Sequence, residues 1–210
     1  MANEIDWSKI RKGRDAASKS LPKITKLPIV KSNRRVISSI LKDGDVILDI
    51  GANNRNLEKY LGSIPVKTSY LSFDIDKNLL HDYYDIASID RKFDVIVALD
   101  VIEHMTLIDT VVLFERIHEL LKPSGCVVIS TPNMCHPVRF WRDCTHITPY
   151  RYDELAGLLI SAGFHDIKIC RIKDMKAKDR LRYWIYSPLL RLLDIDFAPG
   201  IVAIAKPTMI

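Results

Sequence analysis

The stretch Val46-Ile-Leu-Asp-Ile-Gly-Ala-Asn-Asn-Arg-Asn-Leu-Glu-Lys-Tyr-Leu61 decides the fold. An apolar run leads into a turn at Gly51, and a helical pattern follows from Asn56. A buried parallel strand has this continuous apolar character, and a glycine at its carboxyl end lets a ligand approach the backbone because no Cβ intervenes. The pattern therefore predicts a strand, a tight turn and a helix, with a cofactor bound at the turn.

Strands and helices alternate along the rest of the chain. A segment of about eighteen residues between two of the strands leaves room for only a short helix and a short strand. The alternation predicts one α/β domain with a doubly wound parallel sheet, whose ligand lies beyond the carboxyl ends of the strands. Strands are predicted at 46–50, 66–73, 93–99, 126–130, 165–172 and 201–205, and helices at 33–41, 107–121, 153–162 and 179–193.

The composition fits one globular domain. The chain has 210 residues, of which 48% are hydrophobic, and no apolar run approaches the roughly 20 residues that span a bilayer. The first residues also lack the basic start and apolar middle of a secretory signal, so a cytoplasmic protein is expected. The four cysteines form no C-x-x-C pair, and the spacing of Cys135, His136, Cys144 and His146 matches no common zinc template. We therefore expect no metal.

Basic residues gather before the first strand. Residues 1–33 are predicted to form a basic N-terminal arm or lid, and residues 34–210 the main domain. Such an arm could contact phosphate or anionic lipid. Between Lys9 and Arg35, however, no aromatic residue is available to stack on bases, so nucleic acid is not expected as a partner.

Several blocks, in the right order over residues 34–172, resemble the class I S-adenosylmethionine-dependent methyltransferases of the small-molecule kind. They are Val-Ile-Leu-Asp-Ile-Gly (46–51), Leu-Ser-Phe-Asp-Ile-Asp (71–76), Phe-Asp-Val-Ile-Val-Ala-Leu-Asp-Val-Ile-Glu-His (93–104), Leu-Lys-Pro-Ser-Gly-Cys-Val-Val-Ile-Ser-Thr-Pro-Asn (121–133), and His-Ile-Thr-Pro-Tyr (146–150) with the helix that follows it. The resemblance implies a Rossmann-like, seven-stranded sheet whose last strand is antiparallel, and S-adenosylmethionine as the cofactor.

The resemblance also assigns residues to the cofactor. Asp49 would serve the methionine end, Gly51 would allow close approach, Asp74 would hold the ribose hydroxyls and Asp85 would face the adenine. The backbone through Asp100 would flank the sulfonium. Carboxylates suit these roles because the ammonium, ribose and adenine amino groups of the cofactor are all hydrogen-bond donors. The alternative for the aspartates is that they are solvated acids at strand ends.

The turn departs from the family pattern at two positions, where Asn53 and Arg55 replace glycines. Asparagine tolerates the left-handed region, so Asn53 is retained as a cofactor-binding residue. Arg55 has three interpretations: it points away on the helix, it contacts the methionine carboxylate, or it marks a site that has lost its cofactor. The last interpretation makes a non-catalytic binding module the alternative function. A nicotinamide dehydrogenase is not favoured, because the G-x-G-x-x-G pattern is absent.

The long irregular stretch 131–149 is predicted to form the substrate side, since loops of this length in a compact domain are usually functional. If the acceptor atom is a hydroxyl oxygen, a base helps, and His146 with Asp143 nearby is the first candidate and His136 the second. Each histidine could instead only orient the loop. The run 140–146 resembles a segment of methyltransferases associated with cell-surface polysaccharide assembly, which favours a small-molecule, sugar or glycolipid acceptor and O-methylation.

A basic and aromatic insertion is predicted at about 173–200. Its basic residues precede apolar ones around Trp184, a composition that suits contact with a membrane surface. Pro188 interrupts the helical pattern, and a wide apolar face more commonly packs on its own sheet or on a second subunit. Peripheral membrane contact and a homodimer are therefore both considered.

Overall fold

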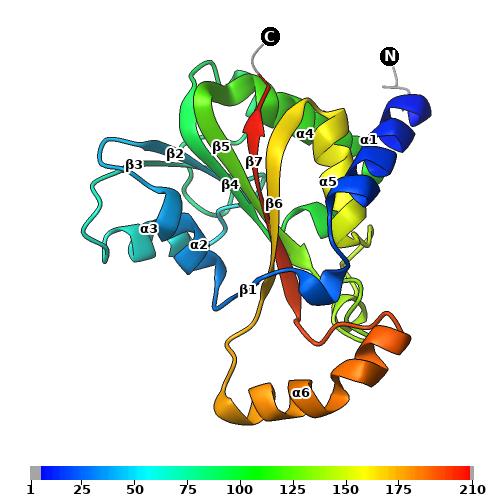
Figure 1. The fold of residues 1–210 in the computed structure, drawn as a ribbon. Helices are drawn as coiled ribbons and strands as arrows, with labels where there is room; N and C mark the ends of the chain where they lie inside the picture. The colour runs from blue at the N-terminus through cyan, green and yellow to red at the C-terminus, as the bar shows by residue number, and fades with distance from the viewer. Residues whose placement is uncertain (1–5, 209–210) are drawn as a thin grey trace.

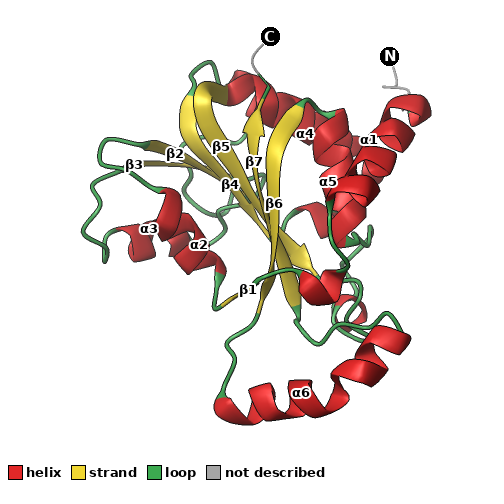
Figure 2. Ribbon diagram, viewed as in Figure 1, coloured by secondary structure: helices red, strands yellow, loops and turns green. Residues whose placement is uncertain are grey.

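The protein is described by a computed structural model that covers residues 6–208. A seven-stranded sheet forms its centre, and helices lie on both faces (Figures 1 and 2). The strand order is β1-β6-β7-β5-β4-β2-β3. The strands are β1 (Ile29–Val30), β2 (Val46–Ile50), β3 (Ser69–Phe73), β4 (Phe93–Leu99), β5 (Leu121–Pro132), β6 (Phe164–Ile172) and β7 (Gly200–Pro207).

The predicted doubly wound fold is confirmed. The strands β3, β2, β4 and β5 are parallel to their neighbours, whereas β7 is antiparallel to both β5 and β6. The carboxyl ends of the four parallel strands consequently meet at one edge of the sheet. That edge carries the loops from which a ligand site is built in folds of this kind.

The helices form two layers and one outlying element. α1, α4 and α5 pack on one face of the sheet, and α2 and α3 on the other (Figure 1). Side chains alternate along each strand, so that in β2 Ile47 packs with α2 and α3 while Leu48 packs on the opposite face. The helices are α1 (Trp7–Ser20), α2 (Asn33–Ile40), α3 (Asn56–Leu61), α4 (Leu107–Leu120), α5 (Tyr152–Ser161) and α6 (Ala177–Leu192).

The segment before residue 34 packs against the domain. α1 lies on α5 at a glycine pair, where a Cβ on Gly13 would lie 2.2 Å from the carbonyl oxygen of Gly157. β1 then pairs with β6 at the edge of the sheet. The division of the chain at residue 33 stays a prediction, and residues 1–5 of the expected arm lie outside the described residues.

The seventh strand is not the one that the sequence predicts. A short helix and strand were expected between residues 73 and 93, but this segment holds only one bridge, from Phe73 to Tyr83, and the 3-10 turn η2 (Ile86–Ser88). β1 completes the sheet at the other end. A two-residue strand has no periodicity that a sequence pattern can reveal, because only its pairing with β6 defines it.

The insertion at about 173–200 contains α6, which lies away from the sheet beyond the ends of β6 and β7 (Figure 1). Among the described residues, no helix is long and apolar enough to cross a membrane.

Candidate active site

The turn after β2 is built around Gly51. Its φ of +70° is a left-handed conformation, and a Cβ at this position would lie 2.5 Å from Cγ2 of Val101. The N–H groups of Gly51 and Ala52 both donate to the carbonyl oxygen of Phe73, at 2.9 and 3.2 Å. Glycine is therefore required for two reasons: the backbone at this position has a positive φ, and the side chain of Val101, in the loop after β4, leaves no room for a Cβ.

Two carboxylates flank this turn. Asp49 is 5% exposed and accepts a hydrogen bond from the Tyr70 hydroxyl at 2.7 Å, and its burial raises its pKa to about 6. Asp74 accepts from the backbone N–H of Asn53 at 2.8 Å. Asn53 has a φ of +41°, the left-handed conformation that the sequence predicts for it. The structure thus brings Asp49, Gly51, Asn53 and Asp74 together at one turn.

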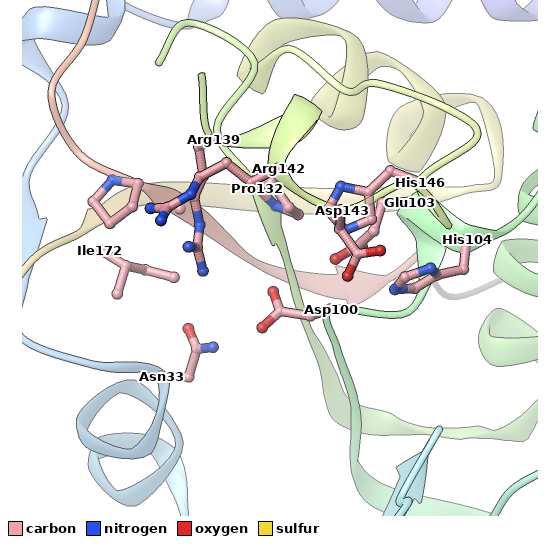
Figure 3. Close-up of a pocket in the computed structure, with 12 residues that line it drawn as sticks. Asn33, Asp100, Glu103, His104, Pro132, Arg139, Arg142, Asp143, His146 and Ile172 are labelled. Atoms are coloured by element: carbon pink, nitrogen blue, oxygen red, sulfur yellow. The ribbon is translucent and has the colours of Figure 1, made fainter. Parts of the chain in front are cut away.

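A pocket of about 540 Å³ lies beside the exits of β4 and β5 (Figure 3). Asp100 lines it, holds a φ of +54° and accepts from the Ser130 hydroxyl at 3.0 Å. Four further parts of the chain contribute to the wall: the start of α2, the end of β6, the start of β7 and the loop that contains the 3-10 turn η4 (Phe140–Arg142). The polar side chains of the wall are Asn33, Asp100, Glu103, His104, Arg139, Arg142, Asp143 and His146.

Glu103 is the deepest acid of this pocket. It is 1% exposed, Oε2 accepts from the Thr131 hydroxyl at 3.1 Å, and Oε1 has no hydrogen-bond partner in the described part of the chain. Burial raises its pKa to about 8, so the carboxyl keeps its proton at neutral pH. Its carbonyl oxygen also accepts from the N–H groups of Ile147 and Thr148, at 2.7 and 3.1 Å, which ties the substrate-side loop to β4.

Two histidines meet beside Glu103 (Figure 3). Nδ1 of His146 lies 2.7 Å from the carbonyl oxygen of Phe140, and Nδ1 of His104 lies 3.2 Å from that of Thr145. A carbonyl oxygen only accepts, so Nδ1 of each ring carries the proton in these bonds and Nε2 keeps a lone pair in the neutral form. The ring centroids are 4.9 Å apart.

The comparisons with known proteins identify the family of the chain. A family model described as a methyltransferase domain matches residues 27–169. The chain belongs to the class I S-adenosylmethionine-dependent methyltransferase family. A probable S-adenosylmethionine-dependent methyltransferase of Mycobacterium tuberculosis is 37% identical over 102 residues, covering 42% of this chain and 35% of that protein. The matched region thus spans about a third of this curated relative.

Solved structures share the fold of this chain. An S-adenosylmethionine-dependent methyltransferase from Archaeoglobus fulgidus superposes with a TM-score of 0.64 at 20% identity, covering 82% of this chain and 90% of that one. Phosphoethanolamine N-methyltransferase 2 from Haemonchus contortus, solved with S-adenosylmethionine, gives 0.62 at 18% identity, covering 84% of this chain and 52% of that one. At these identities the likeness concerns the fold alone.

The backbone of Arg55 belongs to the turn after β2, but its side chain is held by acids outside that turn. Its φ is +52°, and its guanidinium pairs with Glu58 at 2.8 Å and Asp82 at 3.6 Å. It also lies over the ring of Tyr70, with 5.4 Å between the guanidinium carbon and the ring centroid. Of the three interpretations of Arg55, the structure favours the one in which the side chain points away from the turn.

Of the remaining predicted site residues, Asp143 lines the pocket, whereas Asp85 and His136 do not. Asp85 is exposed and caps η2 by accepting from the N–H of Ala87 at 2.9 Å. Asp143 lines the pocket, but its carboxylate accepts from Thr145 rather than from His146. These bonds hold the pKa of Asp143 below its usual value. His136 is not among the residues that line the pocket. The cofactor role of Asp85 and the catalytic roles of Asp143 and His136 stay predictions.

Glu103 and His104 are the residues that the sequence underrates. By its sequence alone, the acid-histidine pair directly after the strand at 93–99 indicates only a cap for the loop that follows, and the carbonyl oxygen of Glu103 does bind that loop. Only the fold shows that the Glu103 carboxyl is buried beside His146.

Potential ligand atoms of Glu103, His104 and His146 lie within 4.8 Å of one another, a spacing that would also admit a divalent cation. The expectation of no metal stays a prediction, which chelation tests below.

Replacing Gly51 by alanine is expected to lower the affinity of the chain for S-adenosylmethionine by at least about tenfold, because the new methyl group would displace Val101 and distort the turn. Titration calorimetry measures this. Gly44→Ala is the matched control: its φ is also positive, at +87°, but a Cβ there has no neighbour within 4 Å. The control should lose about 1 kcal/mol of stability and keep its affinity. Equal affinities for both variants would contradict the prediction.

Proposed function

We propose that the chain transfers a methyl group from S-adenosylmethionine to a hydroxyl oxygen of a small-molecule, sugar or glycolipid acceptor. The observation that carries this proposal is the arrangement of His146, whose Nδ1 is fixed by the Phe140 carbonyl so that Nε2 can take a proton inside the pocket. A hydroxyl is a weak nucleophile until its proton is removed, so a positioned base favours an oxygen acceptor.

The turn after β2 fits the cofactor. Asp49 and Asp74 form no ion pair with any cationic side chain of residues 6–208, although Asp49 is almost fully buried. A buried carboxylate without a cationic partner is costly, and the ammonium group of the methionine end would relieve that cost. Asp74, half-buried beside Asn53, can accept from the ribose hydroxyls.

The chemistry follows from positioning and one proton transfer. S-adenosylmethionine supplies an electrophilic methyl group on a positively charged sulfur. His146 would take the proton of the acceptor hydroxyl as its oxygen bonds to that methyl carbon, and cleavage of the carbon–sulfur bond would give a neutral thioether. Alignment in the pocket can contribute on the order of 7–11 kcal/mol to lowering the barrier. Protonated Glu103 can donate a hydrogen bond that orients the acceptor.

Two arginines support an anionic acceptor. Arg139 and Arg142 line the pocket and, in Figure 3, extend toward Asn33 and Ile172 rather than toward the histidines. Neither forms an ion pair within residues 6–208. Guanidinium groups bind phosphate and carboxylate in a two-pronged geometry, which suits a phosphorylated or acidic sugar.

The alternative function, a binding module without catalysis, depended mainly on Arg55. The contacts of Arg55 with Glu58 and Asp82 explain the presence of an arginine at this position without the loss of a cofactor site.

Calorimetry over a range of pH tests the cofactor part of this proposal. We expect S-adenosylmethionine and its demethylated product to bind, with an affinity that falls as the pH drops below about 6, because protonation of Asp49 removes the partner of the ammonium group. Proton release should accompany binding near pH 6.

Replacing Asp74 by alanine should weaken the binding of S-adenosylmethionine by about 1.5–3 kcal/mol. Asp76→Ala, two residues away and exposed, is the control.

The transfer itself is tested with tritiated S-adenosylmethionine and a panel of hydroxyl-bearing sugars, nucleotide sugars and glycolipids. Label should appear in a hydroxyl acceptor. If the wild type shows no heat with the cofactor at millimolar concentration, the enzyme is not a methyltransferase in function. If heat is seen but label appears in none of these hydroxyl compounds and only in amines or thiols tested beside them, the oxygen acceptor is wrong and the cofactor assignment stands.

A further inference from the structure

The outer face of α6 carries an uncovered apolar stripe. None of the helix residues is buried, and Trp184 and Leu192 are 77% and 80% exposed. The spacing of the exposed residues is helical, so their side chains fall on one side. This stripe consists of Leu181, Trp184, Ile185, Pro188, Leu189 and Leu192. An exposed apolar surface of this kind on one helix marks an interaction site.

The opposite side of α6 holds the helix on the domain. The ring of Tyr183 packs on Phe197 with centroids 4.6 Å apart, and its hydroxyl donates to the carbonyl oxygen of Thr25 at 3.3 Å. The guanidinium of Arg171 lies over the same ring. These contacts fix which side of the helix faces the protein, so the apolar stripe faces away from it.

Basic residues border the stripe on both sides. Arg180 and Arg191 lie four residues before and seven residues after Trp184, along one edge, and Lys178 and Arg182 lie along the other. None of the four forms an ion pair within the described residues. A second copy of the chain docked stripe to stripe would set these cations against their own equivalents, which is unfavourable. An anionic lipid surface can cover the apolar stripe and also neutralise the cations beside it. Apolar side chains insert at the boundary of such a surface, and its headgroups pair with the flanking cations.

The position of α6 connects this surface to the pocket. The insertion leaves β6 at Ile172 and returns to β7 at Gly200, and both residues line the pocket. We infer that α6 lies flat on an anionic lipid bilayer and holds the pocket beside that surface, where it takes an acceptor hydroxyl carried by a lipid. The docking of α6 stands on its own residues, whereas the lipid-borne acceptor rests on the proposed methyl transfer.

Vesicle co-sedimentation of the full chain tests the docking. The wild type should bind phosphatidylcholine vesicles that contain about 30% phosphatidylglycerol at about 0.1 M salt, and bind much less at about 0.5 M salt or without the anionic lipid. Trp184→Ser with Leu192→Ser, and separately Arg180→Glu with Arg191→Glu, should each lower the partition coefficient at least about tenfold. Trp7→Ser is the matched control, since Trp7 is 65% exposed on α1, and it should bind as the wild type does.

Two further measurements make the result decisive. All variants should keep the wild-type melting temperature, because the replaced side chains are exposed, and should keep the wild-type affinity for S-adenosylmethionine. If the wild type does not bind S-adenosylmethionine, the proposed function is overturned, whereas the proposed docking of α6 on the bilayer is unaffected. The docking is overturned if the wild type ignores anionic vesicles, if the stripe variant binds them equally well, or if light scattering shows a dimer that the stripe variant alone dissociates.

Discussion

Replacing His146 by alanine is expected to slow methyl transfer by about 10²–10⁴-fold, the usual contribution of a positioned general base, while the affinity for S-adenosylmethionine stays within about threefold. The reason is local: Nδ1 of His146 is held by the Phe140 carbonyl, and the ring serves the acceptor side of the pocket rather than the turn after β2. Tritium transfer to an acceptor found in the panel measures the rate, and calorimetry measures the affinity.

Three companion experiments separate a base from the other roles of this ring. Added imidazole should restore part of the activity of His146→Ala, which a merely structural role does not predict. His136→Ala compares the second candidate base, and His165→Ala, at the far end of β6, is the matched control. Treatment with EDTA should leave the wild-type rate unchanged. Inactivation by EDTA that zinc or magnesium reverses would show that Glu103, His104 and His146 act through a metal instead.

The second large effect is on stability. Glu103→Gln is expected to raise the free energy of unfolding at pH 9 by about 2–4 kcal/mol, because it removes a buried carboxylate that must otherwise ionise in place. The pKa of Glu103 is raised from 4.5 to about 8, and a shift of this size sets an upper limit of about 5 kcal/mol on the effect. The amide of glutamine can still accept from the Thr131 hydroxyl, which keeps the hydrogen bond at Oε2.

The pH dependence has a definite sign. The unfolded chain releases the Glu103 proton near pH 4.5 and the folded chain near pH 8, so the folded state binds more protons between these values. Stability contributed by this group therefore falls as the pH rises from 4.5 to 8 and is lost above that range. Urea unfolding of the wild type and Glu103→Gln should coincide near pH 4.5 and diverge toward pH 9. Glu115→Gln, a half-exposed surface acid, is the control and should show no such divergence.

Much of the candidate cofactor site follows from local sequence. The apolar run before Asp49, the glycine at 51 and the acid at 74 each lie at the end of a strand, and the carboxyl ends of parallel strands necessarily meet at one edge. The placement of Asp49, Gly51, Asn53 and Asp74 around one turn was therefore predictable. The fold class was predictable for the same reason, since the strand and helix periods are properties of short segments.

Tertiary structure alone decided the rest, because each remaining feature depends on residues far apart in the chain. The side chain of Arg55 pairs with Asp82, which lies 27 residues later in the chain. The residues of β1 form a strand only because they pair with β6. Glu103 becomes a buried, protonated acid because the loop around residue 147 folds over it. The sequence by itself determined a methyltransferase fold with a glycine turn between β2 and α3 where a cofactor is predicted to bind. Only the packing decided which acid and which histidine share the pocket, since burial and proton affinity are set by neighbours that the local pattern does not contain.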